Sequence, residues 1–553
     1  MKKKQILSIL SLSLTIVSFA QTNLTLVKDI NTSTTYGIGN GDPSAFTVMN
    51  NKLYFLGNDG VTPGEKIFIT DITNTNTEMI GPVAGAGTAI TNITAYNNRL
   101  YFYFNDGING IELWSSDGTT AGTSMFNDFR PGLVSGTNIP ASSTPENLTV
   151  CNNLLFFTAF DGTANFAQLF VTDGTLGGTI KLGGVGANLA SSGPAGKFMT
   201  YNNKIYFTGN TGSGYGFWES DGTVSGTKLI TSSINLLESS YNLINNALYF
   251  YASSNATAMQ GIYRFDNTLG LQLLKDTVGP STSGTTDFIE FNGQIFISGY
   301  DLTNSQNNIG YELWVSDGTP AGTKLFKDIN LGSGNSKPHN FTIYNSHLYF
   351  LTIHNGGELW ETDGTLGGTV LVKTSTGGSG RNINVLYNKM YFGQAYMWES
   401  DGTPSGTFQI TPTITLDNTY NHYASIIFNQ ELYFDAYYLD VSSNSSGLEL
   451  CKLNNPLSGI NDSPDLISQI NVYPNPSNEF VMVELFNPTQ KNISVVISDV
   501  LGKQTIQKSA ACYSTGKQTI TLNINDVPNG IWLISVVDEA NQKLTTQKIV
   551  IQK

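Results

Sequence analysis

The residues of this sequence that could do chemistry recur in one short motif, which places a Glu, a Trp and an Asp-Gly-Thr turn within eight positions. The clearest copies begin at Glu112, Glu312 and Glu358. Two such carboxylates, one as acid and one as base or nucleophile, are what glycoside hydrolysis requires. Other copies carry a different residue at the same place: Lys66, Gln168 and Gly216. The sequence therefore selects no catalytic pair.

An aromatic residue lies two positions after the start of each copy, and five of the six tryptophans of the chain occupy that place. They are Trp114, Trp218, Trp314, Trp360 and Trp398. Flat aromatic faces stack on the apolar faces of sugar rings, so these residues suit carbohydrate binding. Packing between repeats also requires a ring at a fixed place in every copy. We favour the packing role, because a binding site needs only a few copies.

The Asp-Gly-Thr turn supplies a carboxylate in six copies: Asp117, Asp173, Asp221, Asp317, Asp363 and Asp401. Such a carboxylate could ligate calcium, but a calcium loop needs several oxygen donors in quick succession, and the sequence has no D-x-D-x-D-G run. In a turn, Asp accepts hydrogen bonds from nearby amides and Gly adopts the left-handed conformation. We therefore expect a structural turn and no metal.

No other group of residues forms a recognisable reaction centre. The three cysteines, Cys151, Cys451 and Cys512, are widely spaced, and three buried free thiols is a simpler interpretation than one disulfide. The four histidines show no metal-binding spacing, and there is no nucleophile elbow, P-loop or zinc helix. The sequence thus predicts no catalytic, cofactor or metal site and favours a binding protein over an enzyme.

The composition is that of a turn-rich β protein. Only 13% of the 553 residues are charged, the formal net charge is -14, and 57 residues are Gly. A typical globular chain has ~25% charged residues, and the A/E/K/L/R-rich strings of helical bundles are absent. These values exclude an all-α fold and argue against nucleic acid as a partner, because phosphate binding needs clustered Lys and Arg.

Internal repetition accounts for this composition. An apolar triplet preceded by a polar turn pair such as Asn-Asn recurs at spacings of about 42 to 55 residues. The nine triplets begin at Leu53, Leu100, Leu155, Ile205, Leu248, Ile295, Leu348, Met390 and Leu432. With the strands around the Trp motif, each unit has four short strands, the pattern of a propeller blade. We predict an all-β propeller of about nine four-stranded blades, with seven or eight blades as the alternative if a divergent unit, such as the fifth, is excluded.

The two ends of the array complement each other. The ninth unit lacks a fourth strand, and the segment Leu24–Ile30 resembles the fourth strand that begins at Lys324. Pairing the segment with the ninth unit would close the ring and remove both sheet edges. The array, about residues 24 to 454, resembles the bacterial ELWxxDGT repeat proteins, a resemblance that labels the repeat and implies no common activity.

The first 20 residues have the layout of a signal peptide. Lys2, Lys3 and Lys4 precede an apolar run from Ile6 to Phe19, which Ala20 follows, and the run is too short and too often interrupted by serine for a membrane anchor. We expect cleavage near Ala20 and export of the remaining chain. No later segment is apolar over a spanning length, so no transmembrane segment is expected in the mature chain.

The last part of the chain has a different pattern. Residues 455–467 form a linker rich in Pro, Ser and Asn, and 468–553 contain alternating strands typical of a small Ig-like β-sandwich. Its distinctive residues are Tyr473, Pro474, Asn475, Pro476, Gly502, Lys503, Gly530, Trp532 and Lys548. With these, the region resembles the type A C-terminal sorting domain of the type IX secretion system of Bacteroidetes, which more often has Tyr in place of this Trp. The resemblance implies passage through the outer membrane, followed by release or attachment to surface lipopolysaccharide.

The expected organisation is a signal peptide over 1–20, a propeller over 21–454, a linker and a sorting sandwich. We expect a monomeric, secreted or surface-attached protein whose partners are the secretion machinery and a glycan, surface polymer or protein ligand bound by loops at one end of the ring. One alternative is a polysaccharide hydrolase or lyase with its site at the ring axis. The other is a structural surface component.

Overall fold

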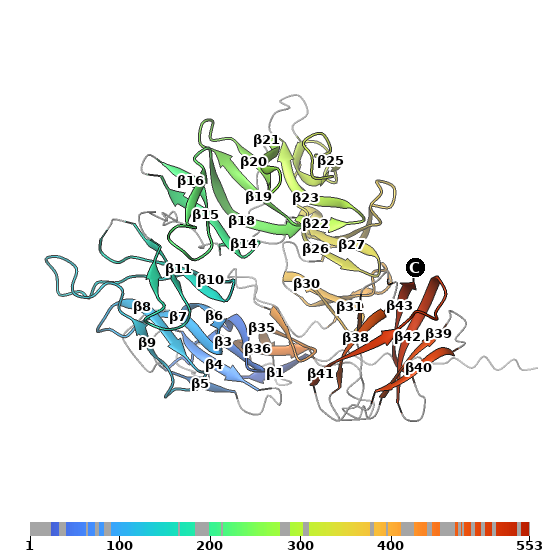
Figure 1. Ribbon diagram of the computed structural model, residues 1–553, viewed down its shortest axis with the longest axis horizontal. Helices are drawn as coiled ribbons and strands as arrows, with labels where there is room; N and C mark the ends of the chain where they lie inside the picture. The colour runs from blue at the N-terminus through green and yellow to red at the C-terminus, as the bar shows by residue number, and fades with distance from the viewer. Residues whose placement is uncertain are drawn as a thin grey trace, which may run out of the picture. The chain divides into compact units, whose positions relative to one another are not determined.

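The computed structural model consists of β-strands and the connections between them (Figure 1). Two compact units result, one formed by Thr22–Asn454 and the other containing Asn455–Lys553. The structure describes residues 24–31, 40–61, 65–71, 77–81, 90–163, 166–182, 198–211, 214–276, 288–301, 309–376, 381–393, 396–410, 425–439, 445–453, 470–473, 477, 480–487, 493–498, 504–510, 516–538 and 543–551. The predicted signal peptide, its cleavage site and the predicted linker lie outside these residues.

The described residues of the larger unit form nine four-stranded antiparallel sheets, numbered in chain order. Sheets 1 to 3 comprise β2 (Ser44–Met49), β3 (Lys52–Gly57), β4 (Lys66–Thr70) and β5 (Glu78–Ile80); β6 (Thr91–Tyr96), β7 (Arg99–Asn105), β8 (Ile111–Ser116) and β9 (Ser124–Asn127); and β10 (Glu146–Cys151), β11 (Leu154–Ala159), β12 (Gln168–Thr172) and β13 (Ile180–Lys181). Sheets 4 to 6 comprise β14 (Met199–Tyr201), β15 (Lys204–Asn210), β16 (Tyr215–Ser220) and β17 (Lys228–Thr231); β18 (Ile234–Ile244), β19 (Ala247–Ser254), β20 (Gln260–Asp266) and β21 (Gly270–Asp276); and β22 (Phe288–Phe291), β23 (Gln294–Asp301), β24 (Ile309–Ser316) and β25 (Lys324–Lys327). Sheets 7 to 9 comprise β26 (His339–Tyr344), β27 (His347–Thr352), β28 (Glu358–Thr362) and β29 (Val370–Thr374), with the 3-10 turn η1 (His354–Gly356) before β28; β30 (Arg381–Leu386), β31 (Lys389–Gly393), β32 (Trp398–Ser400) and β33 (Thr407–Gln409); and β34 (Ser425–Phe428), β35 (Glu431–Leu439), β36 (Ser445–Leu453) and β1 (Leu24–Lys28).

The turn between the first two strands of every sheet is the tight turn that the sequence predicts. Both turn residues have positive φ in each of the nine hairpins, as at Asn50 (49°) and Asn51 (57°). Two successive left-handed residues define the type I′ turn, which Asn and Gly adopt at least cost. Because this turn matches the twist of the strands, it fixes the register in which each apolar triplet pairs with the strand before it.

Each apolar triplet packs against neighbouring sheets on both faces of its own sheet. In the first triplet, Leu53, Tyr54 and Phe55 are at most 2% exposed. Leu53 and Phe55 pack in the cluster shared with sheet 9, whereas Tyr54 packs in the cluster shared with sheet 2. Neighbouring residues of a strand point to opposite faces, so a sheet covered on both faces needs a continuous apolar run in place of an alternating one.

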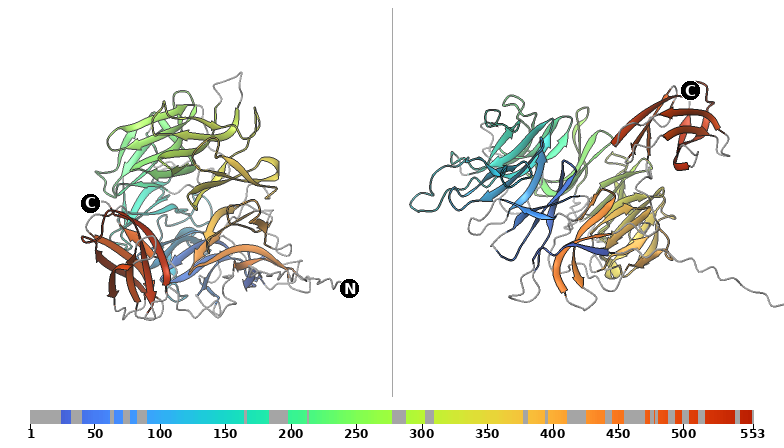
Figure 2. Two further views of the ribbon diagram at one scale, coloured as in Figure 1. Left: turned by 90° about the vertical axis from the view of Figure 1, so that its right-hand side faces the viewer. Right: turned by 90° about the horizontal axis from the view of Figure 1, so that it is seen from below.

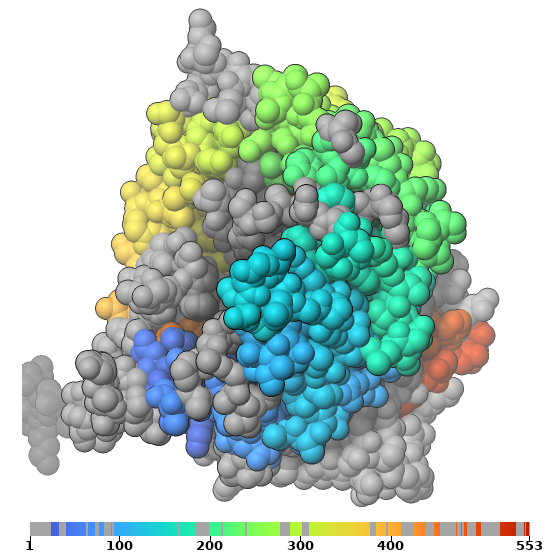
Figure 3. Space-filling model, turned by 90° about the vertical axis from the view of Figure 1, so that its left-hand side faces the viewer, coloured from blue at the N-terminus to red at the C-terminus, as the bar shows by residue number. Residues whose placement is uncertain are grey.

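Hydrophobic clusters join every sheet to the next in chain order, and a ninth cluster joins sheet 9 to sheet 1. Figure 1 shows the same succession from blue to orange, with the orange β35 and β36 beside the blue β1. Figure 2 shows these sheets from two further directions, and Figure 3 shows the blue to green sheets on one face of the unit. The predicted all-β, propeller-like arrangement of four-stranded sheets is confirmed, and the divergent fifth unit also forms a four-stranded sheet.

Sheet 9 is assembled from both ends of its unit. β1 pairs antiparallel with β36, and Leu24, Thr25 and Leu26 lie opposite Leu453, Lys452 and Cys451. Leu24 and Leu26 pack in the cluster between sheets 8 and 9, and Ile30 packs in the cluster between sheets 9 and 1. The predicted pairing of the N-terminal segment with the ninth unit is therefore confirmed.

The smaller unit has two sheets around one core. Their strands are β37 (Ile470–Tyr473), β38 (Phe480–Asn487) and β41 (Gly516–Asn523) in the first, and β40 (Gln504–Ala510), β39 (Ile493–Ser498), β42 (Gly530–Asp538) and β43 (Lys543–Ile551) in the second. Alternate residues of both sheets, such as Val481, Val495 and Ile534, are fully buried in the shared cluster. The sequence pattern does not mark β40, because Gln504–Ala510 is mostly polar and lacks a clear alternation of apolar and polar residues.

Candidate functional site

The Asp-Gly-Thr loop between the third and fourth strands is a closed hydrogen-bond network, seen here in sheet 6. Asp317 Oδ1 accepts hydrogen bonds from the backbone N–H of Thr319 (2.9 Å) and from its hydroxyl (2.7 Å). The Thr319 hydroxyl oxygen accepts one from the Gly322 N–H (3.1 Å). At the base of the loop, the hydroxyls of Ser316 and Thr323 are bonded to each other (2.7 Å).

The same network accounts for the glycine three positions after the Thr. A Cβ at Gly322 would lie 1.9 Å from Asp317 Oδ1, a distance that no side chain can occupy. The equivalent glycines, whose Cβ would also lie at about 2 Å from the Asp of their loop, are Gly122, Gly178, Gly226, Gly368 and Gly406. The conserved spacing within this chain, S/T-D-G-T-x-x-G-T, is thus the set of residues that closes the loop on itself.

These contacts occupy Oδ1 of each Asp carboxylate and favour its charged form. Hydrogen bonds from Thr319 lower the pKa of Asp317, and the equivalent Thr365 lowers the pKa of Asp363. The pKa of each Asp is lowered because its charged carboxylate accepts two hydrogen bonds from the Thr, which stabilise the charged form. Within the part of the chain that the structure describes, no group of three or more His, Cys, Asp or Glu side chains could hold a metal ion.

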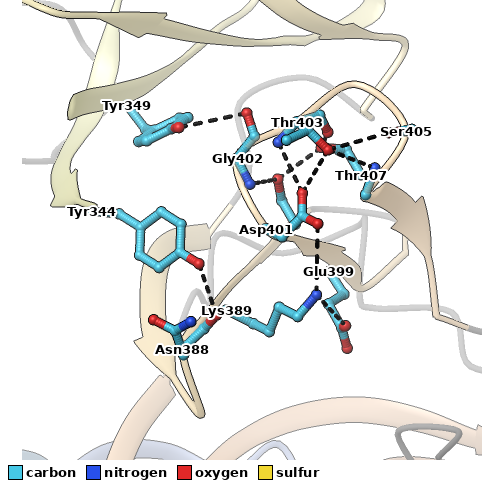
Figure 4. A network of polar contacts seen from close by, with 12 residues as sticks. Tyr344, Tyr349, Asn388, Lys389, Glu399, Asp401, Gly402, Thr403, Ser405 and Thr407 are labelled. Atoms are coloured by element: carbon cyan, nitrogen blue, oxygen red, sulfur yellow. Dashed lines mark hydrogen bonds and ion pairs between the residues drawn. The ribbon is translucent and has the colours of Figure 1, made fainter. Parts of the chain in front are cut away.

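The loop also contacts the preceding sheet. In sheet 8, shown in Figure 4, the Tyr349 hydroxyl of sheet 7 donates to the carbonyl of Gly402 (3.5 Å), beside Asp401. The Tyr344 hydroxyl donates to the carbonyl of Asn388 (2.7 Å) in the hairpin turn of sheet 8. The motif therefore also holds neighbouring sheets together.

The tryptophans of the motif lie in the clusters between sheets. Trp114, Trp218, Trp314, Trp360 and Trp398 each pack against one of five different inter-sheet clusters. Trp314 is 3% exposed, and the ring of Trp360 stacks on Phe350 at 6.5 Å with an interplanar angle of 12°. The buried ring of Trp314 presents no open face on which a sugar could stack, and the other four rings are partly buried against their clusters.

The three glutamates that suggested hydrolysis lie on three different sheets and are buried. Glu112 accepts hydrogen bonds from the Phe129 N–H (2.9 Å) and the Ser143 N–H (2.8 Å). Glu312 accepts equivalent bonds from the Ile329 N–H (2.7 Å) and the Ser336 N–H (2.9 Å). Each carboxylate thus fastens the segment that leads from the fourth strand to the next sheet.

The third glutamate has different partners. Glu358 Oε2 accepts a hydrogen bond from the Trp360 indole N–H (2.8 Å), and Oε1 accepts one from the Asn355 amide (2.9 Å). No two of these three carboxylates are brought together by their contacts. Each side chain is at most 2% exposed.

Sequence reasoning missed a fourth carboxylate of this kind, Glu449 in sheet 9. Its oxygens accept hydrogen bonds from the Ile30 N–H (2.6 Å) and the Gly41 N–H (3.0 Å), so it fastens the segment after β1. The sequence signal for such a carboxylate has two parts. The fourth strand is followed by Asp-Ile or Asp-Phe, and the third strand has a Glu two positions before the residue that is usually aromatic. Burial raises the pKa of Glu449 to about 8, that of Glu112 to about 7 and that of Glu312 to about 6.

A long connection between sheets 2 and 3 presents apolar side chains to solvent. Leu133 and Ile139 are 58% and 62% exposed. The connection is a short hairpin, in which the Val134 N–H donates to the carbonyl of Ile139 (2.8 Å) and the Ala141 N–H donates to that of Gly132 (2.9 Å). Its two ends are the Phe129 and Ser143 amides held by Glu112. This ordered, exposed apolar hairpin is called the 129–143 loop below.

Some of the motif residues predicted for the C-terminal module lie in its strands. Tyr473 ends β37, Gly530 begins β42 and Lys548 lies in β43. The indole N–H of Trp532 donates to the carbonyl of Pro528 (2.8 Å), and the ring packs against the core of the module. The remaining motif residues lie outside the described residues: Pro474, Asn475, Pro476, Gly502 and Lys503.

The two cysteines that the structure describes, Cys151 and Cys451, are free and buried. Cys512 lies outside the described residues. Among the described residues, no helix has the length and apolar character needed to cross a membrane.

Comparison with known proteins identifies the C-terminal module. Residues 471–552 match the model of the secretion system C-terminal sorting domain. No curated protein matches the chain. Similar solved structures include PorZ, an essential bacterial surface component of the type IX secretion system of Porphyromonas gingivalis, with 12% identity over 93% of this chain and 76% of that chain and a TM-score of 0.33. The computationally designed protein Ika8 has 13% identity over 67% of this chain and 96% of its own, with a TM-score of 0.34.

Proposed function

We propose that this chain is a binding protein of the cell surface or exterior, built as a closed nine-bladed β-propeller that its C-terminal domain directs out of the cell. The sorting domain over 471–552 carries this proposal. That domain implies export through the type IX secretion system, and so a secreted or cell-surface location. The propeller part of the proposal is supported by nine four-stranded sheets whose interface clusters run in cyclic order.

A binding role fits the distribution of polar contacts better than catalysis does. The carboxylates of the repeat motif are either bonded within their own loop or buried against backbone amides. A glycosidase needs two carboxyl groups facing a substrate, and these do not provide them. Recognition then depends on the residues that differ between repeats, which are found in the connections between sheets.

We place the ligand contact at the 129–143 loop. Its exposed Leu133 and Ile139 are carried on a backbone whose hydrogen bonds are internal, so binding would order few additional residues. A convex apolar hairpin of this kind suits the apolar face of a glycan or an apolar depression on a protein. Loops at one end of a rigid array of sheets are a common location for binding residues.

The proposal is tested with purified protein from which residues 1–20 are omitted. Binding to a glycan array and to isolated cell-surface polymer is compared for the wild type, the double variant Leu133→Ser/Ile139→Ser, and the control Leu176→Ser/Leu366→Ser. The control residues are as exposed, at 61% and 58%, but lie in Asp-Gly-Thr loops at the other end of the strands. We expect the first variant to lose at least about tenfold in affinity and the control to bind like the wild type.

Equal binding by all three proteins would place the contact elsewhere. Release of reducing sugar from a polysaccharide by the wild type would replace binding with hydrolysis as the function. A strain producing the chain without residues 471–552 tests export separately, because the truncated protein should remain inside the cell envelope.

A further inference from the structure

The closing strand of the larger unit is held differently from every other fourth strand. In sheets 1 to 8 the fourth strand follows the third through a short connection, and in six of them this is the self-bonded Asp-Gly-Thr loop. β1 has no such connection to β36, because its residues precede those of β36 by more than 400 positions. Its attachment consists of strand pairing, side-chain packing and the contacts of Glu449.

The two strands compared here occupy the same position in their sheets. In sheet 6, Leu325 of β25 lies opposite Trp314, and in sheet 9 Leu26 of β1 lies opposite Cys451. Both strands are followed by Asp-Ile, and the Ile amide of each donates to the buried Glu of the third strand. The backbone donor and the accepting Glu are the same in both sheets, whereas only β25 is joined to its third strand by a short covalent connection.

Glu449 joins two parts of the N-terminal segment to β36 at once. Oε2 accepts the Ile30 N–H, directly after β1, and Oε1 accepts the Gly41 N–H, just before β2. The N–H groups of Gly41 and Asp42 also donate to the carbonyl of Leu448 (2.9 and 3.1 Å). The Glu449 side chain is 0% exposed. Water can therefore replace it as the acceptor of these two N–H groups only if the seam between sheets 9 and 1 opens.

We propose that the outer edge of β36 and Glu449 form a strand-binding site, occupied here by the chain's own Leu24–Ile30, and that this segment docks and releases as one unit, latched by Glu449. The site selects an extended peptide with apolar residues at alternate positions and an unblocked backbone N–H six positions after the first. β-strand addition of this kind draws affinity from main-chain hydrogen bonds and specificity from the pockets for alternate side chains.

The latch makes closure the last step of assembly. Loop closure between Leu24–Ile30 and β36 is possible only when both segments are present, and β36 is the last strand before the C-terminal module. Contacts between segments so distant in sequence form late, because the entropy of closing the loop is lost before the contacts form. The larger unit therefore has a built-in dependence on completion of its chain, whatever ligand it binds.

Hydrogen exchange of the full-length protein, followed by mass spectrometry, tests the latch with a matched control. Glu449→Gln keeps the shape of the side chain but replaces one accepting oxygen by an NH2 group that faces an N–H donor. Glu112→Gln makes the same change in sheet 2, where β9 remains connected to β8 through its loop.

We expect Glu449→Gln to accelerate exchange about tenfold or more throughout Leu24–Ile30 and in the facing residues Leu450–Leu453. Glu112→Gln should accelerate exchange at Phe129 and Ser143 and leave β9 within about twofold of the wild type. Unchanged exchange in β1 of the first variant, or equal acceleration of β9 in the second, overturns the proposal.

A second measurement needs no variant and so does not depend on how Glu449→Gln folds. Exchange of the wild type at increasing urea should show Leu24–Ile30 opening as a single unit at a lower free energy than β9 and β25. If these residues exchange only when the whole unit unfolds, the segment is not a separable latch and the proposal is wrong.

Discussion

A disulfide across the closing seam should stabilise the larger unit far more than the same bridge elsewhere. Thr25 of β1 lies directly opposite Lys452 of β36, and Ser115 of β8 lies opposite Ser124 of β9 at the equivalent position of sheet 2. Directly opposed residues of an antiparallel pair have Cα atoms about 4.5 to 5.5 Å apart, which suits a disulfide. The double variants are Thr25→Cys/Lys452→Cys and Ser115→Cys/Ser124→Cys.

The expected difference follows from the length of chain that each bridge encloses. The closing bridge spans about 430 residues, and the loss of chain entropy in the unfolded state is then about 6 kcal/mol at 25 °C. The local bridge spans about 10 residues, for which the same relation gives about 3 kcal/mol. The closing bridge should therefore add about 3 kcal/mol more to the free energy of unfolding, provided that both bridges form without strain.

The assay compares oxidised and reduced protein of the same variant, so the loss of the Lys452 ion pair with Glu431 (2.8 Å) is common to both states. Urea unfolding is followed by tryptophan fluorescence, because five of the six tryptophans belong to the repeat motif of the larger unit. Peptide mapping confirms that Cys451, which is adjacent and buried, remains free. If the bridge forms and the closing variant gains no more stability than the local one, pairing of the two ends does not limit unfolding, and the reasoning is refuted.

Three further outcomes are expected. Burial raises the pKa of Glu449 from 4.5 to about 8, so its contribution to stability is fully present below pH 4.5 and is lost as the pH rises to 8. Tm should therefore fall over this pH range, and Glu449→Gln should flatten the dependence of Tm on pH. A variant whose Tm depends on pH in parallel with the wild type contradicts the assignment. Gly368→Ala should lower the free energy of unfolding, measured in urea, by about 1 to 3 kcal/mol, because its Cβ would meet Asp363 Oδ1 at 2.1 Å. The neighbouring Gly367→Ala should have little effect, because no atom lies within 4 Å of its Cβ. Equal losses of stability in the two variants would show that the close contact is unimportant. Removal of residues 471–552 should abolish appearance of the chain outside the cell in fractionation experiments, and undiminished export would exclude the sorting role.

Much of the fold could be predicted from local patterns because each repeat carries its own turn chemistry. The Asn-Asn pairs specify left-handed turns, and the apolar triplets specify strands covered on both faces, so strand order within a sheet follows directly. Pairing of Leu24–Ile30 with the ninth unit was also predictable, because the fourth strand beginning at Lys324 provides an internal template. β40 was missed, since Gln504–Ala510 is mostly polar and lacks a clear alternation.

The roles of the acidic residues were less accessible from sequence. A Glu at the start of a strand is compatible with catalysis, surface exposure or burial, and only the fold shows that Glu112 and Glu312 are buried against backbone amides. Glu449 was not recognised, because its partners Ile30 and Gly41 lie at the opposite end of the larger unit. The signal that links them is indirect: the Asp-Ile pair that Leu24–Ile30 shares with the strand beginning at Lys324, and the Glu two positions before the aromatic place.

The repeat motif and the proposed binding function make opposing demands on the same chain. A residue that recurs in most sheets is fixed by what those sheets share, namely a closed loop or a packed interface, as Asp317 and Trp314 illustrate. Asp317 Oδ1 accepts its hydrogen bonds inside its own loop, and the Trp314 ring is covered by the cluster between sheets. Specific recognition therefore has to come from residues that break the repetition, and the exposed 129–143 loop is such a break. The same Glu112 that fastens this loop belongs to the repeated motif, so the regular part of the structure holds the irregular part in place.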